Sequence, residues 1–217
     1  MKRLARWAAL TLMIGGTVFT VGGTWRDPML WAYTGIFAAV GLIALLSIDE
    51  DLARERFNPP TPGADRLWLR AIRLTGVAHL VMGALDTGRL HWTDSVPQPL
   101  RFLGLAGLAM SFGLVIYAMR TNRFFSSVVR MQPERGHRVV DDGPYGIVRH
   151  PGYAGMIPFV PFSGLALGSW ASFAIGLVFS LLIVRRVRFE DRFLHEHLAG
   201  YADYAQRVRY RLVPGAW

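Results

Sequence analysis

Apolar and polar residues alternate along this chain in long blocks, not with the two-residue period of a half-buried strand. Five apolar stretches, each bounded by charge, proline or glycine, lie at about 7–24, 29–48, 71–85, 100–118 and 152–184. The first, second and fourth stretches are close in length to the roughly 20 residues that a membrane-crossing helix needs. The third is shorter, and would have to extend back through Trp68 and Leu69 to cross.

The last stretch is too long for one simple crossing and has Gly168-Ser169 at its middle. It predicts two short helices folded into a hairpin, each roughly 24 Å long at about 1.5 Å per residue. Pro158 and Pro161 are expected to kink the first arm. The pattern therefore predicts an all-α, polytopic membrane bundle of about six short spans, with the hairpin last.

The N-terminus has the order of a secretory signal peptide, because basic residues precede an apolar run from Trp7 to about Gly23. The run is long for a signal peptide, however, and no Ala-x-Ala site follows it. We expect an uncleaved first span. Residues 1–118 then hold four spans and residues 119–217 the remainder, in one structural domain.

Composition supports lipid as the solvent. The chain is 52% hydrophobic, with a net charge of +9 carried by twenty-three arginines and one lysine, which is too apolar for an ordinary soluble domain. The arginines fall between the apolar runs instead of forming one stripe, which argues against a nucleic-acid partner. The absence of cysteine excludes disulfides, a thiolate nucleophile and cysteine-ligated metal.

The distribution of positive charge predicts the orientation. With the N-terminus inside and six crossings, the inside segments carry 21 of the 24 Lys and Arg residues, and Arg26, Arg89 and Arg101 lie outside. Positive residues concentrate in cytoplasmic loops. We therefore expect both termini in the cytoplasm, in a bacterial cytoplasmic membrane.

Chemistry-bearing residues gather in the second half, where Arg149-His150-Pro151 stands at the start of the hairpin. An Arg at full membrane depth costs roughly 2.5–3.5 kcal/mol, so these side chains either snorkel as an anchor or serve a site. Both interpretations are open from these residues alone.

From Asn122 onward the sequence resembles the isoprenylcysteine carboxyl methyltransferases and the related membrane phospholipid N-methyltransferases. The shared elements, in order, are Gly143-Pro144-Tyr145, Arg149-His150-Pro151-Gly152-Tyr153-Ala154-Gly155, the hairpin, Arg186 with Glu190-Asp191, and a Tyr-rich basic tail from Tyr201 to Pro214. The acidic pair is Glu-Asp where the family usually has Glu-Glu, so Glu190 is expected to matter more than Asp191. The first hundred residues resemble nothing specific.

The resemblance implies an S-adenosylmethionine-dependent membrane methyltransferase with its site on the cytoplasmic face. It implies catalytic roles for Arg186 and Glu190, and no metal. The cofactor-binding residues it implies are His137, Gly143, Tyr145, His150, Tyr153, Gly155 and Glu190. Arg186 and Glu190, four residues apart, share one helix face, where the simpler interpretation is a surface salt bridge.

The methyl acceptor and the activity itself stay open at this point. A lipophilic carboxylate of isoprenoid or lipid-like type ranks first as acceptor, a phospholipid amine second and a small hydrophobic thiol or metabolite third. A non-catalytic membrane accessory protein that retains the methyltransferase frame is the alternative. A transporter is disfavoured, because ionisable residues are expected only at the ends of the spans.

The charge distribution yields a test of topology. A reporter fused after Trp217 should be cytoplasmic and one inserted near Asp94 external, because 21 of the 24 positive residues then lie inside. Alkaline phosphatase and fluorescent-protein fusions measure this directly. An external C-terminus would contradict the six-span arrangement.

Overall fold

A computed structural model describes residues 2–61 and 63–217, and in this part of the chain all regular structure is helical. The α-helices are α1 (Lys2–Gly16), α2 (Pro28–Ser47), α3 (Glu50–Phe57), α4 (Arg66–Leu85), α5 (Gln98–Thr121), α6 (Pro151–Leu167), α7 (Trp170–His197) and α8 (Tyr201–Arg207). Two π-helical segments, η1 (Thr17–Val21) and η2 (Asp86–Leu90), continue α1 and α4. Single 3-10 turns, η3 (Pro133–Arg135) and η4 (Gly143–Gly146), lie between α5 and α6.

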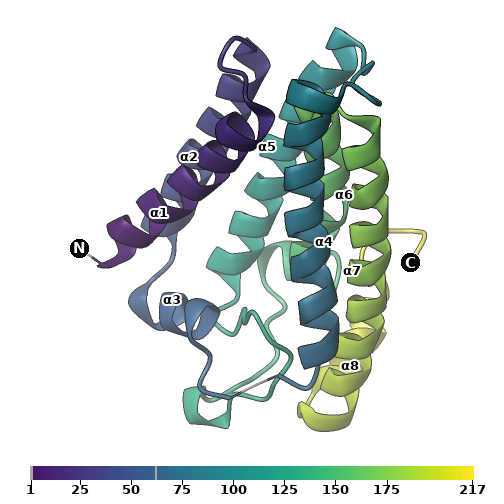
Figure 1. Cartoon of the computed structure of the whole chain (residues 1–217). Coiled ribbons are helices and arrows are strands. Elements are labelled where there is room, and N and C mark those ends of the chain that lie inside the picture. The colour runs from purple at the N-terminus through teal and green to yellow at the C-terminus, as the bar shows by residue number, and fades with distance from the viewer. Residues whose placement is uncertain (1, 62) are drawn as a thin grey trace.

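The long helices form one bundle (Figure 1), in which α6 packs between α5 and α7, and α4 packs against α7. Helices α1 and α2 make a tilted hairpin at one side, joined to the rest through an apolar core. Its fully buried members include Val18 of η1, Leu108 of α5 and Leu167 of α6. The fold therefore agrees with the predicted all-helical bundle.

Among the described residues, four helices are long and apolar enough to cross a membrane: the α1–η1 segment, α2, α5 and α7. The two other expected spans are α6, which has 17 residues, and α4, which extends back to Arg66 and carries three arginines. Both pack alongside the four in the same bundle. The number of crossings stays a prediction.

The predicted hairpin is α6 and α7. Gly168 ends α6 in the left-handed conformation, with φ of +91°, which glycine adopts without steric cost. The Ser169 hydroxyl then caps α7 by accepting a hydrogen bond from the Ser172 amide at 3.1 Å. Helix α7 runs on past the apolar stretch to His197, so it carries Arg186, Glu190 and Asp191 out of the bundle on one rigid element.

The two arms pack closely because small residues face one another. A Cβ on Gly164 would lie 2.4 Å from the Phe173 amide nitrogen, so the close approach of α6 and α7 requires glycine there. Pro161 has no N–H for the Ile157 carbonyl one turn back. The Ser180 hydroxyl of α7 donates to that carbonyl instead, at 2.6 Å.

One expectation about the bundle interior was wrong. His79 is ionisable and lies buried within α4, not at a span end. Its Nε2 lies 2.8 Å from the Ser163 hydroxyl and its Nδ1 2.7 Å from that of Ser172, and Ser163 also bonds Tyr33 at 2.7 Å. These bonds join α2, α4, α6 and α7. The buried polar groups of the bundle thus find their hydrogen-bond partners on neighbouring helices.

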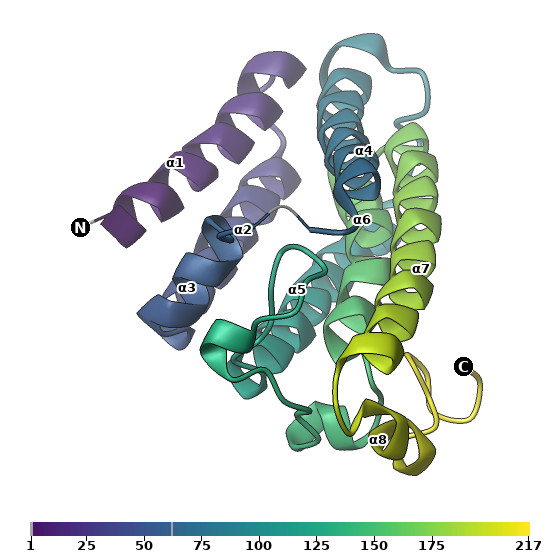
Figure 2. The ribbon, with the colours of Figure 1, turned by 90° about the horizontal axis from the view of Figure 1, so that it is seen from below.

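Segments far apart in the sequence lie at one end of the bundle (Figure 2), where the 122–150 segment lies between α3 and α8. Ion pairs tie them there, including Glu55 with Arg130 and Asp51 with Arg135. The segments expected outside meet at the other end, where Arg101 pairs with Asp27 at 2.5 Å. The predicted grouping of loops is therefore found, and which end faces the cytoplasm stays a prediction.

Packing at the hairpin gives a test with a matched control. Gly164→Ala should lower the free energy of unfolding by about 1–3 kcal/mol, because the methyl group meets the α7 backbone. Gly113→Ala places the same methyl in open space on α5, and should be neutral or stabilising by up to about 1 kcal/mol. Equilibrium unfolding in detergent measures both, and equal effects would contradict the packing role of Gly164.

Candidate functional site

A hollow opens at one end of α5, α6 and α7. The 122–150 segment and α8 cover it. It encloses about 850 Å³ of empty space, counting the part open to solvent at its mouth. Small-molecule sites combine apolar walls with a few converging polar groups. This hollow has both kinds of lining.

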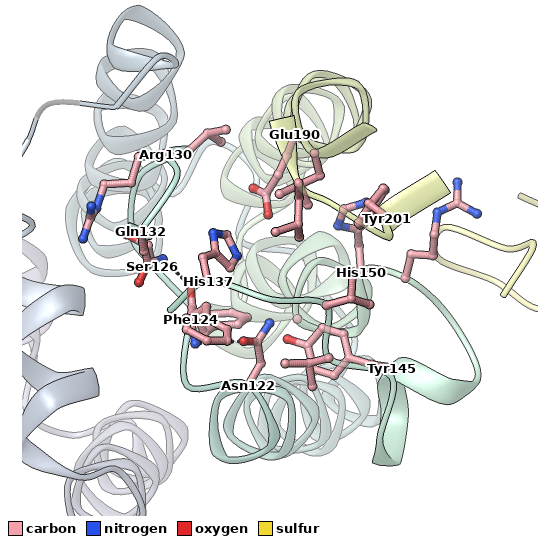
Figure 3. Close-up of a pocket in the computed structure, with 18 of the residues that line it drawn as sticks. Asn122, Phe124, Ser126, Arg130, Gln132, His137, Tyr145, His150, Glu190 and Tyr201 are labelled. Atoms are coloured by element: carbon pink, nitrogen blue, oxygen red, sulfur yellow. Dashed lines mark hydrogen bonds between the residues drawn. The ribbon is translucent and has the colours of Figure 1, made fainter. Parts of the chain in front are cut away.

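The polar groups of the hollow converge from different elements (Figure 3). Glu190 of α7 faces His137 of the covering segment across the space, and Asn122 and Tyr145 close the opposite side. The Tyr153 hydroxyl donates to the Glu190 carboxylate at 2.5 Å. Glu190 is half-buried and makes no ion pair within the described chain, which leaves its carboxylate available to a ligand.

His137 supplies a second available group. Its Nδ1 is buried and has no hydrogen-bond partner among the described residues, although buried polar atoms are nearly always paired. Its ring lies against Phe124, with ring centroids 4.7 Å apart. Burial, together with the nearby Arg130 and Arg135 cations, lowers the pKa of His137 to about 4, so the imidazole is neutral at physiological pH and can either donate or accept.

Asp191, next to Glu190, lies outside the hollow in a dense polar cluster. Arg149 donates to both of its carboxylate oxygens, at 2.9 and 3.2 Å. The His150 Nε2 lies 3.1 Å and the Tyr201 hydroxyl 3.0 Å from Oδ1, and Arg211 donates to Oδ2 at 2.8 Å. A buried carboxylate with this many donors holds together the elements that supply them.

The same cluster holds the C-terminal tail against the start of α6. The Arg149 guanidinium donates to the Val208 and Arg209 carbonyls, both at 2.8 Å. The backbone amide of His150 donates to the Arg211 carbonyl at 2.9 Å. The tail therefore forms a wall of the hollow. The bonds of Arg149 assign it to holding the tail in place, and not to anchoring the chain in the membrane.

Arg186 faces the hollow from α7, one turn before Glu190, and does not pair with it. Its Nε lies 2.8 Å from the Asp65 carboxylate and its Nη2 donates to the Ser127 carbonyl at 2.9 Å. The guanidinium also lies over the Tyr153 ring, 5.7 Å from its centroid. The surface salt bridge that the spacing allowed is therefore absent, and Arg186 is fixed by the loop before α4.

Six of the eight residues expected in the site do line the hollow: His137, Tyr145, His150, Tyr153, Arg186 and Glu190. The other two do not reach it. Gly143 has φ of +52° and is exposed beside Tyr117 of α5. A Cβ on Gly155 would lie 2.7 Å from the Ser111 carbonyl, so its close backbone approach is to α5.

Some residues that line the hollow could not be identified from the sequence pattern. Asn122, Phe124 and Gln132 belong to an irregular segment in which no periodicity marks the inward side. Gln132 is buried and donates to the Phe124 carbonyl at 2.8 Å. Arg56 comes from α3, nearly ninety positions before the first of the motifs, which begins at Gly143. Only the tertiary structure brings it to the site.

Comparison with known proteins finds a similar family. Residues 102–196 match the profile of the isoprenylcysteine carboxyl methyltransferase family. The chain is similar to this family over that region, which contains all six of the expected residues that line the hollow.

Individual relatives agree. A probable protein-S-isoprenylcysteine O-methyltransferase of Oryza sativa subsp. indica is 30% identical over 113 residues, which cover 49% of this chain and 59% of that protein. The cobalt-zinc-cadmium resistance protein CzcN of Cupriavidus metallidurans is 27% identical over 134 residues, 61% of this chain and 58% of that protein. The chain thus matches under two thirds of these relatives' length.

A solved structure of the eukaryotic intramembrane Ras methyltransferase, an isoprenylcysteine carboxyl methyltransferase, has the same fold. It superposes with a TM-score of 0.61 at 19% sequence identity, over 96% of this chain and 78% of that one. The agreement extends to the first hundred residues, where the sequence alone resembles nothing specific.

Substitutions of the two neighbouring acids should lower the stability of the fold by different amounts. Asp191→Asn should destabilise the fold by about 3–5 kcal/mol, because it leaves Arg149 and Arg211 without their counter-charge. Glu190→Gln should cost about 1 kcal/mol or less, since one hydroxyl is its only bonded partner. Unfolding monitored by circular dichroism in detergent compares the two variants. Similar losses of stability would contradict the assignment of Asp191, and not Glu190, to holding the fold together.

Proposed function

We propose that this protein transfers a methyl group from S-adenosylmethionine to a lipophilic acceptor at the cytoplasmic face of the membrane. The observation that carries the proposal is the hollow itself. Most of its lining comes from the family-matched region, and an unpaired imidazole nitrogen and a carboxylate without an ion-pair partner face each other across it.

The donor set of the hollow fits this cofactor. The cofactor presents an ammonium, a carboxylate and an adenine ring with hydrogen-bonding edges. Glu190 supplies a negative group for the ammonium or the adenine. His137 offers the buried Nδ1 that lacks a partner, and Phe124 and Tyr145 offer flat walls for the ring. We assign cofactor binding to these residues together with Tyr153 and His150.

Two of these residues act through position. His150 is fixed by Asp191 on its Nε2 side, so it holds the wall of the hollow in place beside the C-terminal tail. Tyr153 donates to Glu190 and thereby fixes the direction of the carboxylate. A site of this kind works by aligning donor and acceptor and by excluding water.

When bound, S-adenosylmethionine supplies a methyl group on a sulfonium, whose S–CH3 bonding electrons return to sulfur as the methyl passes to the acceptor. A carboxylate acceptor needs no general base, whereas an amine must first lose a proton. Arg186 is the cation of the family motif in the hollow, and we assign it and Glu190 to the reacting centre. An isoprenoid or lipid-like carboxylate is the acceptor that we favour over a phospholipid amine.

The membrane location follows from the acceptor. A lipophilic molecule can reach the helix ends through the bilayer, while the polar cofactor comes from the cytosol under the 122–150 segment and α8. The plant relatives, which are named as isoprenylcysteine O-methyltransferases, support this acceptor class. A non-catalytic accessory protein would share the frame and the cofactor site but transfer no methyl group.

Calorimetric titration of the purified protein with S-adenosylhomocysteine, the demethylated product, tests the site. The wild type should bind it, and Glu190→Gln should weaken binding at least tenfold, or about 1.4 kcal/mol. Glu196→Gln, an exposed acid on the same helix, is the matched control and should have no effect.

Transfer of radiolabelled methyl then tests turnover. Label should enter an N-acetyl-S-prenylcysteine offered in detergent, and not phosphatidylethanolamine. Binding of the product without transfer to any acceptor would favour the accessory protein, and absence of binding would refute the cofactor site.

A further inference from the structure

Arg56 of α3 lines the hollow and lies outside the family-matched region. Its Nη1 donates to the Ser126 carbonyl at 3.2 Å, and its guanidinium lies 4.8 Å from the centroid of the Phe125 ring. Within residues 2–61 and 63–217 it makes no ion pair with a carboxylate, as the ion pairs of this end of the bundle involve other arginines or histidines.

The other arginines around the hollow are different. Arg130 pairs with Glu55, Arg149 with Asp191 and Arg186 with Asp65. Arg138 is exposed and solvated. Arg56 is thus the partly buried cation of the lining that lacks a counter-charge in the described chain. Such a charge is costly unless it is paired, which points to a negative group that arrives with a ligand.

The surroundings raise that cost further. Burial and the neighbouring Arg186 cation lower the pKa of Arg56 to about 10. The side chain is therefore still charged at neutral pH. Glu190, the one free carboxylate of the hollow, does not approach it within ion-pair distance.

The position of Arg56 indicates which ligand carries the negative group. Phe125, under the guanidinium, packs against the apolar cluster formed by α2, α3 and α5, together with Met156 of α6. The hydrogen-bonding residues assigned above to the cofactor, such as His137 and Glu190, lie further along the covering segment and on α7. Arg56 is therefore at the apolar side of the hollow, where a lipophilic chain can lie beside a charged headgroup.

We infer that Arg56 binds the carboxylate of the methyl acceptor and so selects lipophilic acids over neutral or amine-bearing lipids. The inference rests on the proposed function and adds a specificity residue to it from outside the family motifs. A guanidinium matches a carboxylate with two parallel N–H donors, which suits it to this task better than a lysine.

A pair of ligands that differ only in charge tests the assignment. N-acetyl-S-prenylcysteine carries the carboxylate, and its carboxamide is a neutral analogue used as a competitive inhibitor. In the wild type the acid should bind at least tenfold more tightly than the amide. In Arg56→Ala the KM of the acid should rise at least tenfold, and the preference for the acid should fall to about twofold or less. Arg56→Lys should lie between the two.

Matched controls separate this role from a structural one. Arg54→Ala changes an exposed arginine of the same helix and should leave the KM and the acid preference unchanged. Affinity for S-adenosylhomocysteine should stay within about twofold of wild type in Arg56→Ala. If the alanine variant does not fold, Arg56→Gln and Arg56→Lys carry the same comparison.

Three outcomes would overturn the inference. One is an acid preference that survives in the Arg56 variants, and another is a tenfold loss of S-adenosylhomocysteine affinity, which would assign Arg56 to the cofactor. The third is transfer to phosphatidylethanolamine that depends on Arg56, which would make a lipid phosphate its partner. A wild type that binds no S-adenosylhomocysteine would instead refute the proposed function, and direct binding of the acid and the amide would still test Arg56.

Discussion

The site depends on one buried carboxylate. Asp191 receives hydrogen bonds from Arg149 and His150 before α6, from Tyr201 of α8 and from Arg211 of the tail. A buried charge is tolerable only when several donors satisfy it together. These four donors come from three separate segments, so meeting that condition also closes the tail and α8 over the hollow.

Helix geometry divides the work between the two neighbouring acids. Successive helical residues point about 100° apart, so Asp191 is directed into the polar cluster while Glu190 is directed into the hollow. The first acid is fully partnered by the protein, and the second accepts from Tyr153 and is otherwise free. Adjacent carboxylates can therefore serve the fold and a ligand without competing for the same donors.

The irregular cover of the hollow is possible because side chains satisfy its backbone. The Asp65 carboxylate accepts from the Val129 amide, Gln132 donates to the Phe124 carbonyl, and Tyr204 donates to the Tyr145 carbonyl. Buried backbone groups need such partners when helix or sheet does not supply them. These side-chain partners allow an irregular segment to form a wall of the hollow.

The sequence by itself determined the helical class, the hairpin at Gly168-Ser169 and six residues that line the hollow. Hydropathy patterns and motif spacing record these features because both are local along the chain. It did not determine the partners of Arg186 and Asp191 or the packing of Gly155 against α5. It also did not determine that His79 is buried or that Arg56 lines the hollow. Those depend on which segments meet at the end of the bundle. Helix packing decides that, through contacts between residues tens of positions apart that no local pattern records.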